Sequence, residues 1–381
     1  MDDAHARLRL AAFYFFAFGG LGGLLPFLPL VFETRGFDSY AISTVMLLLP
    51  LSNMFVPPLW GLLADAFNAR VAAIRATGIG CAVGTLLLLP DLGLPFAVVG
   101  MATYCFFRAP IIPLADSATY AALGARSDNY ARVRVWGSAG FVVVSTAVGL
   151  LEATKTPTLL FGIAAAVYAC ATIAALGLVA PPPERRPGVL RKALQTVRGT
   201  TLPALFLGSA FYYVGHGAYD VYFGLHARAL GLSDSFVGIA WAVGVTFEIG
   251  LMLVAPRILA RRSTAVLLCV GAAASVFRWW LLSVATSAEL ILVAQSLHAL
   301  TFGLWYVALV KYVQGKAPDA LRASVQGLAQ ASMAVGMMGG YLGGAELNER
   351  FGGVAVFQLA TAAAGCALVV YAFLAIVDRR L

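Results

Sequence analysis

The chain has 381 residues, of which 61% are hydrophobic and 12% are charged, and its formal net charge is +8. A water-soluble protein carries about 25% charged residues, so this chain lacks the polar surface that a soluble fold of its length needs. The composition therefore excludes an ordinary soluble protein and predicts one whose main solvent is lipid.

Twelve apolar runs are long enough to cross a bilayer as helices, which takes about 20 residues each. Backbone in lipid must satisfy its hydrogen bonds internally, so these runs are expected to be helical. They lie at 10–32, 40–63, 71–90, 95–116, 134–151, 158–180, 203–226, 235–256, 264–286, 289–313, 323–345 and 353–377. We therefore predict an all-α membrane protein with twelve transmembrane helices in two six-helix, pseudo-symmetric halves.

One long polar interval separates the sixth run from the seventh. Residues 181–200 read PPPERRPGVLRKALQTVRGT. The prolines at its start disfavour regular helix, and its five basic residues favour water. This interval predicts an N-terminal six-helix bundle at 1–180, a cytoplasmic linker at 181–200 and a C-terminal six-helix bundle at 201–381.

The loop charges indicate an orientation. If both termini are cytoplasmic, 20 of the 26 lysine and arginine residues lie on the cytoplasmic side, four lie on the opposite side and two lie within spans. Such a bias sets the topology of membrane proteins, and it explains the basic excess without nucleic acid. We predict a monomeric, multi-pass protein of a bacterial-type cytoplasmic (inner) membrane with both termini in the cytoplasm.

Several ionisable side chains lie within the predicted spans. Each costs about 2.5–3.5 kcal/mol at the bilayer centre on insertion scales, so such groups usually face a cavity or a partner. The group consists of Arg108, Asp116, Arg134, His216, Asp220, Glu248, Arg278 and His298. Glu248, Arg278 and His298 come from three helices of one half and combine proton-exchanging groups with a fixed cation. We predict that proton coupling uses these three and Asp220; structural ion pairing is the alternative.

The seventh run carries aromatic and ionisable side chains on one helical face. Tyr212, His216 and Tyr219 follow i, i+4, i+7 spacing. Tyrosines in membrane proteins often form an interfacial belt, but a cluster mixed with histidine through mid-span favours the lining of a cavity. We predict that these three side chains bind the solute.

Patterns for catalysis or cofactor binding are missing from the sequence. There is no HExxH or metal-ligand spacing, no Walker or dinucleotide pattern, and the five cysteines are scattered singly. We therefore predict that the protein is not an enzyme, holds no metal and uses no cofactor, with a proton gradient as its driving force.

The turn after the second run reads Gly61-Leu62-Leu63-Ala64-Asp65-Ala66-Phe67-Asn68-Ala69-Arg70. It resembles a loop signature of the major facilitator superfamily, although Ala66 and Asn68 replace a basic residue and a glycine of that pattern. The resemblance implies the major facilitator fold, with Gly61, Asp65 and Arg70 as a cytoplasmic gate.

A more specific resemblance is to the phenylpropionate permease group and, more distantly, to the lactose permease proton symporters. Pro113-Leu114-Ala115-Asp116, with Arg134 eighteen residues later, is similar to the carboxylate–arginine pair that binds sugar in lactose permease. The resemblance implies that Asp116, Arg134 and Phe141 bind the solute, with Phe141 where lactose permease has a tryptophan. Thr301 and Gln295 stand where that permease has a carboxylate and a lysine, which disfavours a galactoside.

Together these features predict a secondary active transporter that moves a small organic solute, an aromatic or organic acid among the candidates, by proton-coupled symport and alternating access. The alternative is a proton-linked antiporter or exporter of amphiphilic compounds. The expected partners are the solute and the lipid bilayer, and no nucleic acid.

Overall fold

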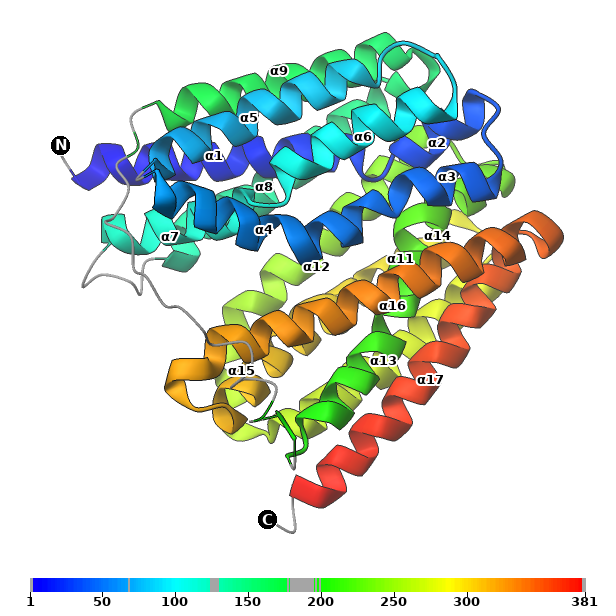
Figure 1. Cartoon of the computed structure of the whole chain (residues 1–381). Helices are drawn as coiled ribbons and strands as arrows, with labels where there is room; N and C mark the ends of the chain where they lie inside the picture. The colour runs from blue at the N-terminus through cyan, green and yellow to red at the C-terminus, as the bar shows by residue number, and fades with distance from the viewer. Residues whose placement is uncertain are drawn as a thin grey trace. The chain divides into compact units, whose positions relative to one another are not determined.

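The computed structural model describes residues 3–67, 69–123, 130–176, 178, 195, 197–198 and 200–378. Over these residues the chain forms helices and turns and contains no strand (Figure 1), which confirms the all-α class. The chain divides into two compact units: the first comprises Met1–Arg185 and Ser233–Ala242, and the second comprises Arg186–Leu232 and Val243–Leu381. The predicted linker at 181–200 lies mostly outside the described residues, so the predicted domain boundaries stay a prediction.

The first unit consists of helices joined by short turns. In chain order they are α1 (Asp3–Leu24), α2 (Leu28–Thr34), α3 (Ser39–Met46), α4 (Leu48–Ala66), α5 (Arg70–Leu87), α6 (Leu94–Arg108), α7 (Ile111–Leu123), α8 (Tyr130–Leu150), the 3-10 turn η2 (Ala153–Lys155) and α9 (Pro157–Ala175). The unit also includes the first residues of α12, which the sequence prediction assigned to the second half.

The second unit is built in the same way. Its helices are α11 (Leu202–Ala229), the rest of α12 (Asp234–Arg261), α13 (Thr264–Val284), α14 (Ala288–Ser296), the π-helical segment η3 (Ala299–Leu304), α15 (Trp305–Lys316), the 3-10 turn η4 (Asp319–Leu321), α16 (Arg322–Phe351) and α17 (Gly353–Asp378).

Among the described residues, ten helical stretches are long and apolar enough to cross a membrane. The predicted spans at 203–226 and 323–345 correspond to α11 and α16, which have 28 and 30 residues but are not among the ten. Their polar, tyrosine- and glycine-rich composition is the physical reason, because it lowers the apolar character of every window along them. The count of twelve spans therefore stays a prediction.

The turn after the first helical stretch is repeated in the second unit. Gly36 and Gly231 have φ angles of 80° and 79°, in the region that glycine adopts without steric cost. In each turn the glycine N–H donates to the carbonyl three residues back, and the next residue donates to the carbonyl five residues back. This is the Schellman pattern that ends a helix, and its recurrence supports the pseudo-symmetric repeat.

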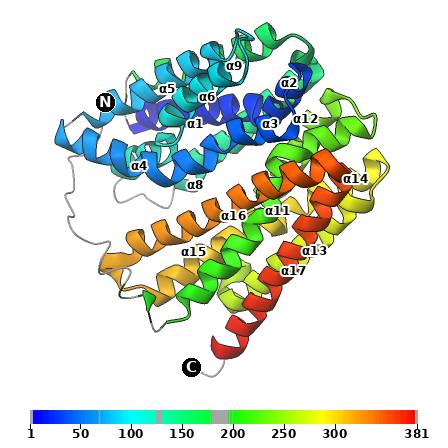
Figure 2. The same cartoon turned by 45° about the vertical axis from the view of Figure 1, so that its right-hand side comes forward.

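Close helix pairs are a second repeated feature. In the first unit α1 packs along α8, and in the second unit α11 packs along α16 (Figure 2). Both pairs meet through glycines: a Cβ on Gly140 would collide with the backbone of Phe15, and a Cβ on Gly340 would collide with the backbone of Val214 and Ala218. Small residues permit this approach between membrane helices.

The fourth predicted span of each six-span half is interrupted. In the first unit α6 ends at Arg108, and α7 begins after Ala109 and Pro110, the latter lacking the N–H that would continue the helix. In the second unit the π-helical η3 follows His298, between α14 and α15. Each interruption therefore lies beside a basic residue that the sequence singles out.

Candidate functional site

Arg278 on α13 is the centre of a buried polar network in the second unit. Its side chain is fully buried. Nη1 donates to Thr301 Oγ1 at 2.9 Å and lies 3.1 Å from His298 Nδ1, and Nη2 donates to Gln295 Oε1 at 2.9 Å. The guanidinium also lies over the Tyr219 ring, with its carbon 4.7 Å from the ring centroid. These neutral acceptors and the ring face accommodate a charge that is costly to bury alone.

Glu248 joins this network through His298. Its Oε2 lies 3.5 Å from His298 Nε2, and both side chains are mostly shielded from solvent, with exposed fractions of 17% and 13%. Arginine can only donate hydrogen bonds, so His298 Nδ1 must accept from Arg278 and the neutral ring carries its proton on Nε2, facing Glu248. Protonation of Glu248 would therefore alter its contact with His298 Nε2, and the same imidazole ring contacts Arg278 through Nδ1.

The π-helical segment η3 supplies a backbone acceptor beside the network. The carbonyl oxygen of Thr301 accepts a hydrogen bond from the Tyr212 hydroxyl and lies 3.2 Å from His216 Nε2. Both donors lie on α11 and are buried. Single π-helical turns occur frequently at functional sites, and this one connects two predicted solute-binding residues to the helix that carries His298.

The other two predicted residues of α11 lie differently. The Tyr219 hydroxyl donates to Gln295 Oε1 at 2.9 Å, so Tyr219 and Arg278 share one acceptor. Asp220 is partly exposed and makes no hydrogen bond or ion pair with the described residues. Three of the four predicted coupling residues are therefore in contact although they lie far apart in the sequence: Glu248, Arg278 and His298. The fourth, Asp220, is not bonded to them.

A second polar cluster surrounds Asp116 in the first unit. Its Oδ1 accepts hydrogen bonds from the hydroxyls of Tyr14, at 2.5 Å, and Tyr130, at 2.9 Å. Arg134 does not pair with this carboxylate; its guanidinium carbon lies 4.0 Å from the ring centroid of Phe18 and 5.4 Å from that of Tyr14. Tyr14 lies between the two predicted partners, with its hydroxyl bonded to the acid and its ring beside the cation.

Phe141, the third residue that the resemblance assigns to solute binding, is buried on α8. Its ring lies 5.9 Å from that of Trp241, with an interplanar angle of 38°. Its backbone also lies close to Gly22 of α1, where an added Cβ would come within 2.7 Å of the Phe141 carbonyl oxygen. Phe141 therefore contributes to helix packing, and its role toward a solute stays a prediction.

Replacing Tyr14 by Phe tests the cluster around Asp116. The change removes a hydrogen bond to a partly buried carboxylate and an acceptor of the Thr119 hydroxyl. Hydrogen bonds to charged groups contribute about 1.5–3 kcal/mol, so we expect the free energy of unfolding to fall by about that amount in detergent micelles. Tyr120→Phe is the matched control, because the half-exposed Tyr120 stacks on Tyr130 and, unlike Tyr14, does not hydrogen-bond to Asp116. Equal stability of the two variants would contradict the role given to Tyr14.

The predicted cytoplasmic gate is only partly described. Gly61 lies on α4 and Arg70 begins α5. A Cβ on Gly61 would meet no atom within 4 Å, so packing does not require glycine there. The side chain of Asp65 lies outside the described residues, and the gate stays a prediction.

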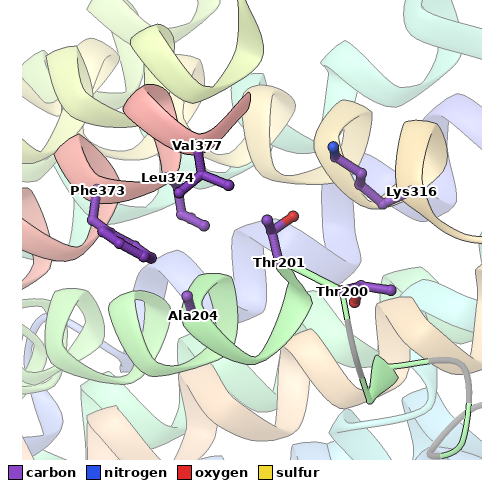
Figure 3. A pocket seen from close by; sticks show the side chains of 7 residues that line it. All are labelled: Thr200, Thr201, Ala204, Lys316, Phe373, Leu374 and Val377. Atoms are coloured by element: carbon purple, nitrogen blue, oxygen red, sulfur yellow. The ribbon is translucent and has the colours of Figure 1, made fainter. Parts of the chain in front are cut away.

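A cavity of about 510 Å³ lies elsewhere in the second unit, where the start of α11, the end of α15 and the end of α17 meet (Figure 3). Apolar side chains of α17 form one side, and Lys316 and two threonines form the other. Lys316 Nζ is already bonded to Asp378 at 2.9 Å. None of the predicted solute-binding or coupling residues lines this cavity, so we do not assign it to transport.

Sequence reasoning missed some members of both clusters. Tyr14 and Tyr130 were not singled out as solute-binding or coupling residues, although they bind the predicted Asp116. Gln295 and Thr301 entered only as departures from lactose permease, yet they hold Arg278. A useful signal was available for these two, because both lie within one turn of His298 on the same predicted span.

A model of the MFS_1 like family matches residues 7–359. The chain belongs to this family. It is 28% identical over 335 residues to "Maltose permease" of Geobacillus stearothermophilus, covering 84% of this chain and 82% of that protein. It is 27% identical over 332 residues to "Uncharacterized transporter YwbF" of Bacillus subtilis (strain 168), covering 85% and 82%. It is also 26% identical over 325 residues to "Probable 3-phenylpropionic acid transporter" of Escherichia coli (strain K12), covering 81% and 82%.

Solved structures agree on the fold. The crystal structure of nucleoside transporter NupG superimposes with a TM-score of 0.83 at 19% identity, covering 98% of this chain and 99% of NupG. The POT family transporter PepTSo gives a TM-score of 0.77 at 15% identity, covering 100% and 98%. At such identities the likeness shows the fold alone. This member of the MFS_1 like family is therefore a multi-pass secondary transporter of the major facilitator fold and not an enzyme.

Proposed function

We propose that this transporter couples the movement of a small organic acid, such as an aromatic acid, to the movement of protons in the same direction. The observation that carries the proposal is the contact chain Glu248–His298–Arg278. It joins a carboxylate that can take up and release a proton to a buried fixed cation through an imidazole ring. Such intramembrane groups typically form proton relays in transporters.

The membrane setting belongs to the same proposal. The loop charges favour a bacterial-type cytoplasmic membrane with both termini in the cytoplasm, where the proton gradient is the energy source and no cofactor is needed. The protein is taken to act as a monomer. The names of the relatives provide the first solutes to try: 3-phenylpropionate, maltose and a nucleoside such as uridine.

Reconstitution into liposomes tests the coupling directly. Counterflow with the three radiolabelled solutes first identifies a transported compound without any gradient. That compound should then accumulate inside vesicles when the outside is acidic, and a protonophore should abolish the accumulation while leaving counterflow unchanged. Uptake that ignores the pH gradient would overturn proton coupling, and accumulation driven only by an acidic interior would support the antiporter alternative.

A further inference from the structure

Arg108 is a membrane-embedded cation that the contact chain in the second unit does not use. It is the last residue of α6, beside the interruption of the fourth span. Its Nη2 donates to Asn53 Oδ1 on α4 at 2.5 Å. Its Nε is buried and has no hydrogen-bond partner within the part of the chain that the structure describes. The Arg108 guanidinium therefore has N–H donors that make no hydrogen bond to the described residues of the first unit.

No carboxylate offsets the charge of Arg108 within the described residues. The titratable groups that face it are Tyr104, Cys105, Tyr168 and Cys81, which are all neutral near pH 7. The other arginines within the spans are accommodated by more contacts: the Nε of Arg278 is also buried without a partner among the described residues, but both of its terminal nitrogens donate to oxygen acceptors, and Arg134 lies over two aromatic rings. A buried charge is normally paired, so the environment of Arg108 favours an anion that the protein itself does not supply.

The surroundings of Arg108 fit a carboxylate attached to an apolar body. A guanidinium presents five N–H donors in a planar fork that matches a carboxylate, and Asn53 takes one of them. Asn53 is exposed and Arg108 is partly exposed, so their contact is not enclosed in the packed interior. Two turns along the same face of α4, Trp60 packs against Phe106 and Phe107, with ring centroids 5.6 Å apart in each case.

We propose that Arg108, oriented by Asn53, binds the carboxylate of the transported solute. This inference rests on the proposed transport of an organic acid and names the residue that selects an anion over a neutral solute. The competing explanation is that Arg108 is structural. A cation in the last turn of a helix is stabilised by the helix dipole, and the amide oxygen of Asn53 supplies a hydrogen-bond acceptor.

Asn53→Asp separates the two explanations. The new carboxylate would take the place of the amide beside the guanidinium and neutralise it from within the protein. Under both explanations this variant folds and gains thermal stability. If Arg108 binds the solute, the variant loses affinity for carboxylates roughly tenfold or more; if Arg108 is only structural, affinity is unchanged.

The binding measurement uses purified protein in detergent, with 3-phenylpropionate and its uncharged amide as a matched pair, and maltose and uridine as neutral solutes. Wild type should bind the carboxylate at least tenfold more tightly than the amide. Arg108→Gln should remove this preference, whereas Arg75→Gln should keep it, because Arg75 only donates to the carbonyls of Ala175 and Leu176. Asn53→Asp gives the same answer if Arg108→Gln fails to fold.

Three results would overturn the assignment: Asn53→Asp that binds the carboxylate as wild type does, Arg108→Gln that keeps the preference, or wild type that binds none of the carboxylate. These outcomes are independent of proton coupling. A protein that loses carboxylate binding in Asn53→Asp but ignores the pH gradient would keep Arg108 as the anion site and refute symport. The reverse pair of results would keep symport and refute the anion site.

Discussion

Replacing Glu248 by Gln is expected to abolish proton-driven accumulation of the solute while leaving solute exchange at least partly intact. Glutamine keeps the size of the side chain and can still accept the hydrogen bond from His298 Nε2, but it cannot take up or release a proton. Within the described part of the chain, the carboxylate that contacts the Arg278 network is that of Glu248, whose Oε2 lies 3.5 Å from His298 Nε2. Loading and unloading of a proton there would stop.

The measurement compares two assays on one preparation of liposomes. Counterflow reports binding and alternating access without net proton movement, and accumulation under a pH gradient reports coupling. Glu346→Gln is the control, because Glu346 pairs with Arg350 at the end of α16 and is 43% exposed. If Glu248→Gln accumulates solute at the wild-type rate, Glu248 is structural, and Asp220, Asp116 or His298 becomes the proton carrier to test.

The second large effect is expected at Gly340 on α16. A Cβ there would overlap the carbonyl oxygen of Val214 and the backbone nitrogen of Ala218, and backbone atoms cannot rotate away as a flexible side chain can. Gly340→Val should therefore force α11 and α16 apart. Overpacking commonly costs about 1–3 kcal/mol and occasionally more, and we expect the upper part of that range or the loss of folded protein.

Gly327→Val on the same helix is the matched control, because a Cβ at Gly327 meets no atom within 4 Å. Both variants carry the same change in helix propensity, so their difference isolates the contact. Yield of monodisperse protein and unfolding in mixed micelles provide the measurement. If the two variants are equally stable, α11 and α16 do not require close approach at Gly340.

Hydropathy and loop charge allowed the helical class and most span positions to be predicted, because lipid imposes a minimum length and an apolar composition on each span. The interruptions could be predicted less well. Pro110 marks the break in the fourth span plainly, since proline lacks an N–H. The π-helical segment Ala299–Leu304 has no such marker, because its residues also suit an α-helix.

The candidate site shows the same limit. Placing Glu248, Arg278 and His298 on separate helices was enough to expect contact, because buried charges seek partners. The spacing of Asp116 and Arg134 suggested a direct pair, but the structure places tyrosine hydroxyls on the acid and aromatic rings beneath the cation. Which neutral group competes for a charge depends on side chains far apart in the sequence, so spacing alone could not reveal it.

The modest apolarity of α11 and α16 has a consequence for how the protein is made. Helices leave the translocon according to their apolarity, and these two are the long helices that fall short of the apolar composition of the others. They pack on each other through glycines. We therefore expect stable lateral release of α11 into lipid to require the synthesis of α16, its packing partner, and a chain truncated before α16 to insert α11 less completely than the full chain does.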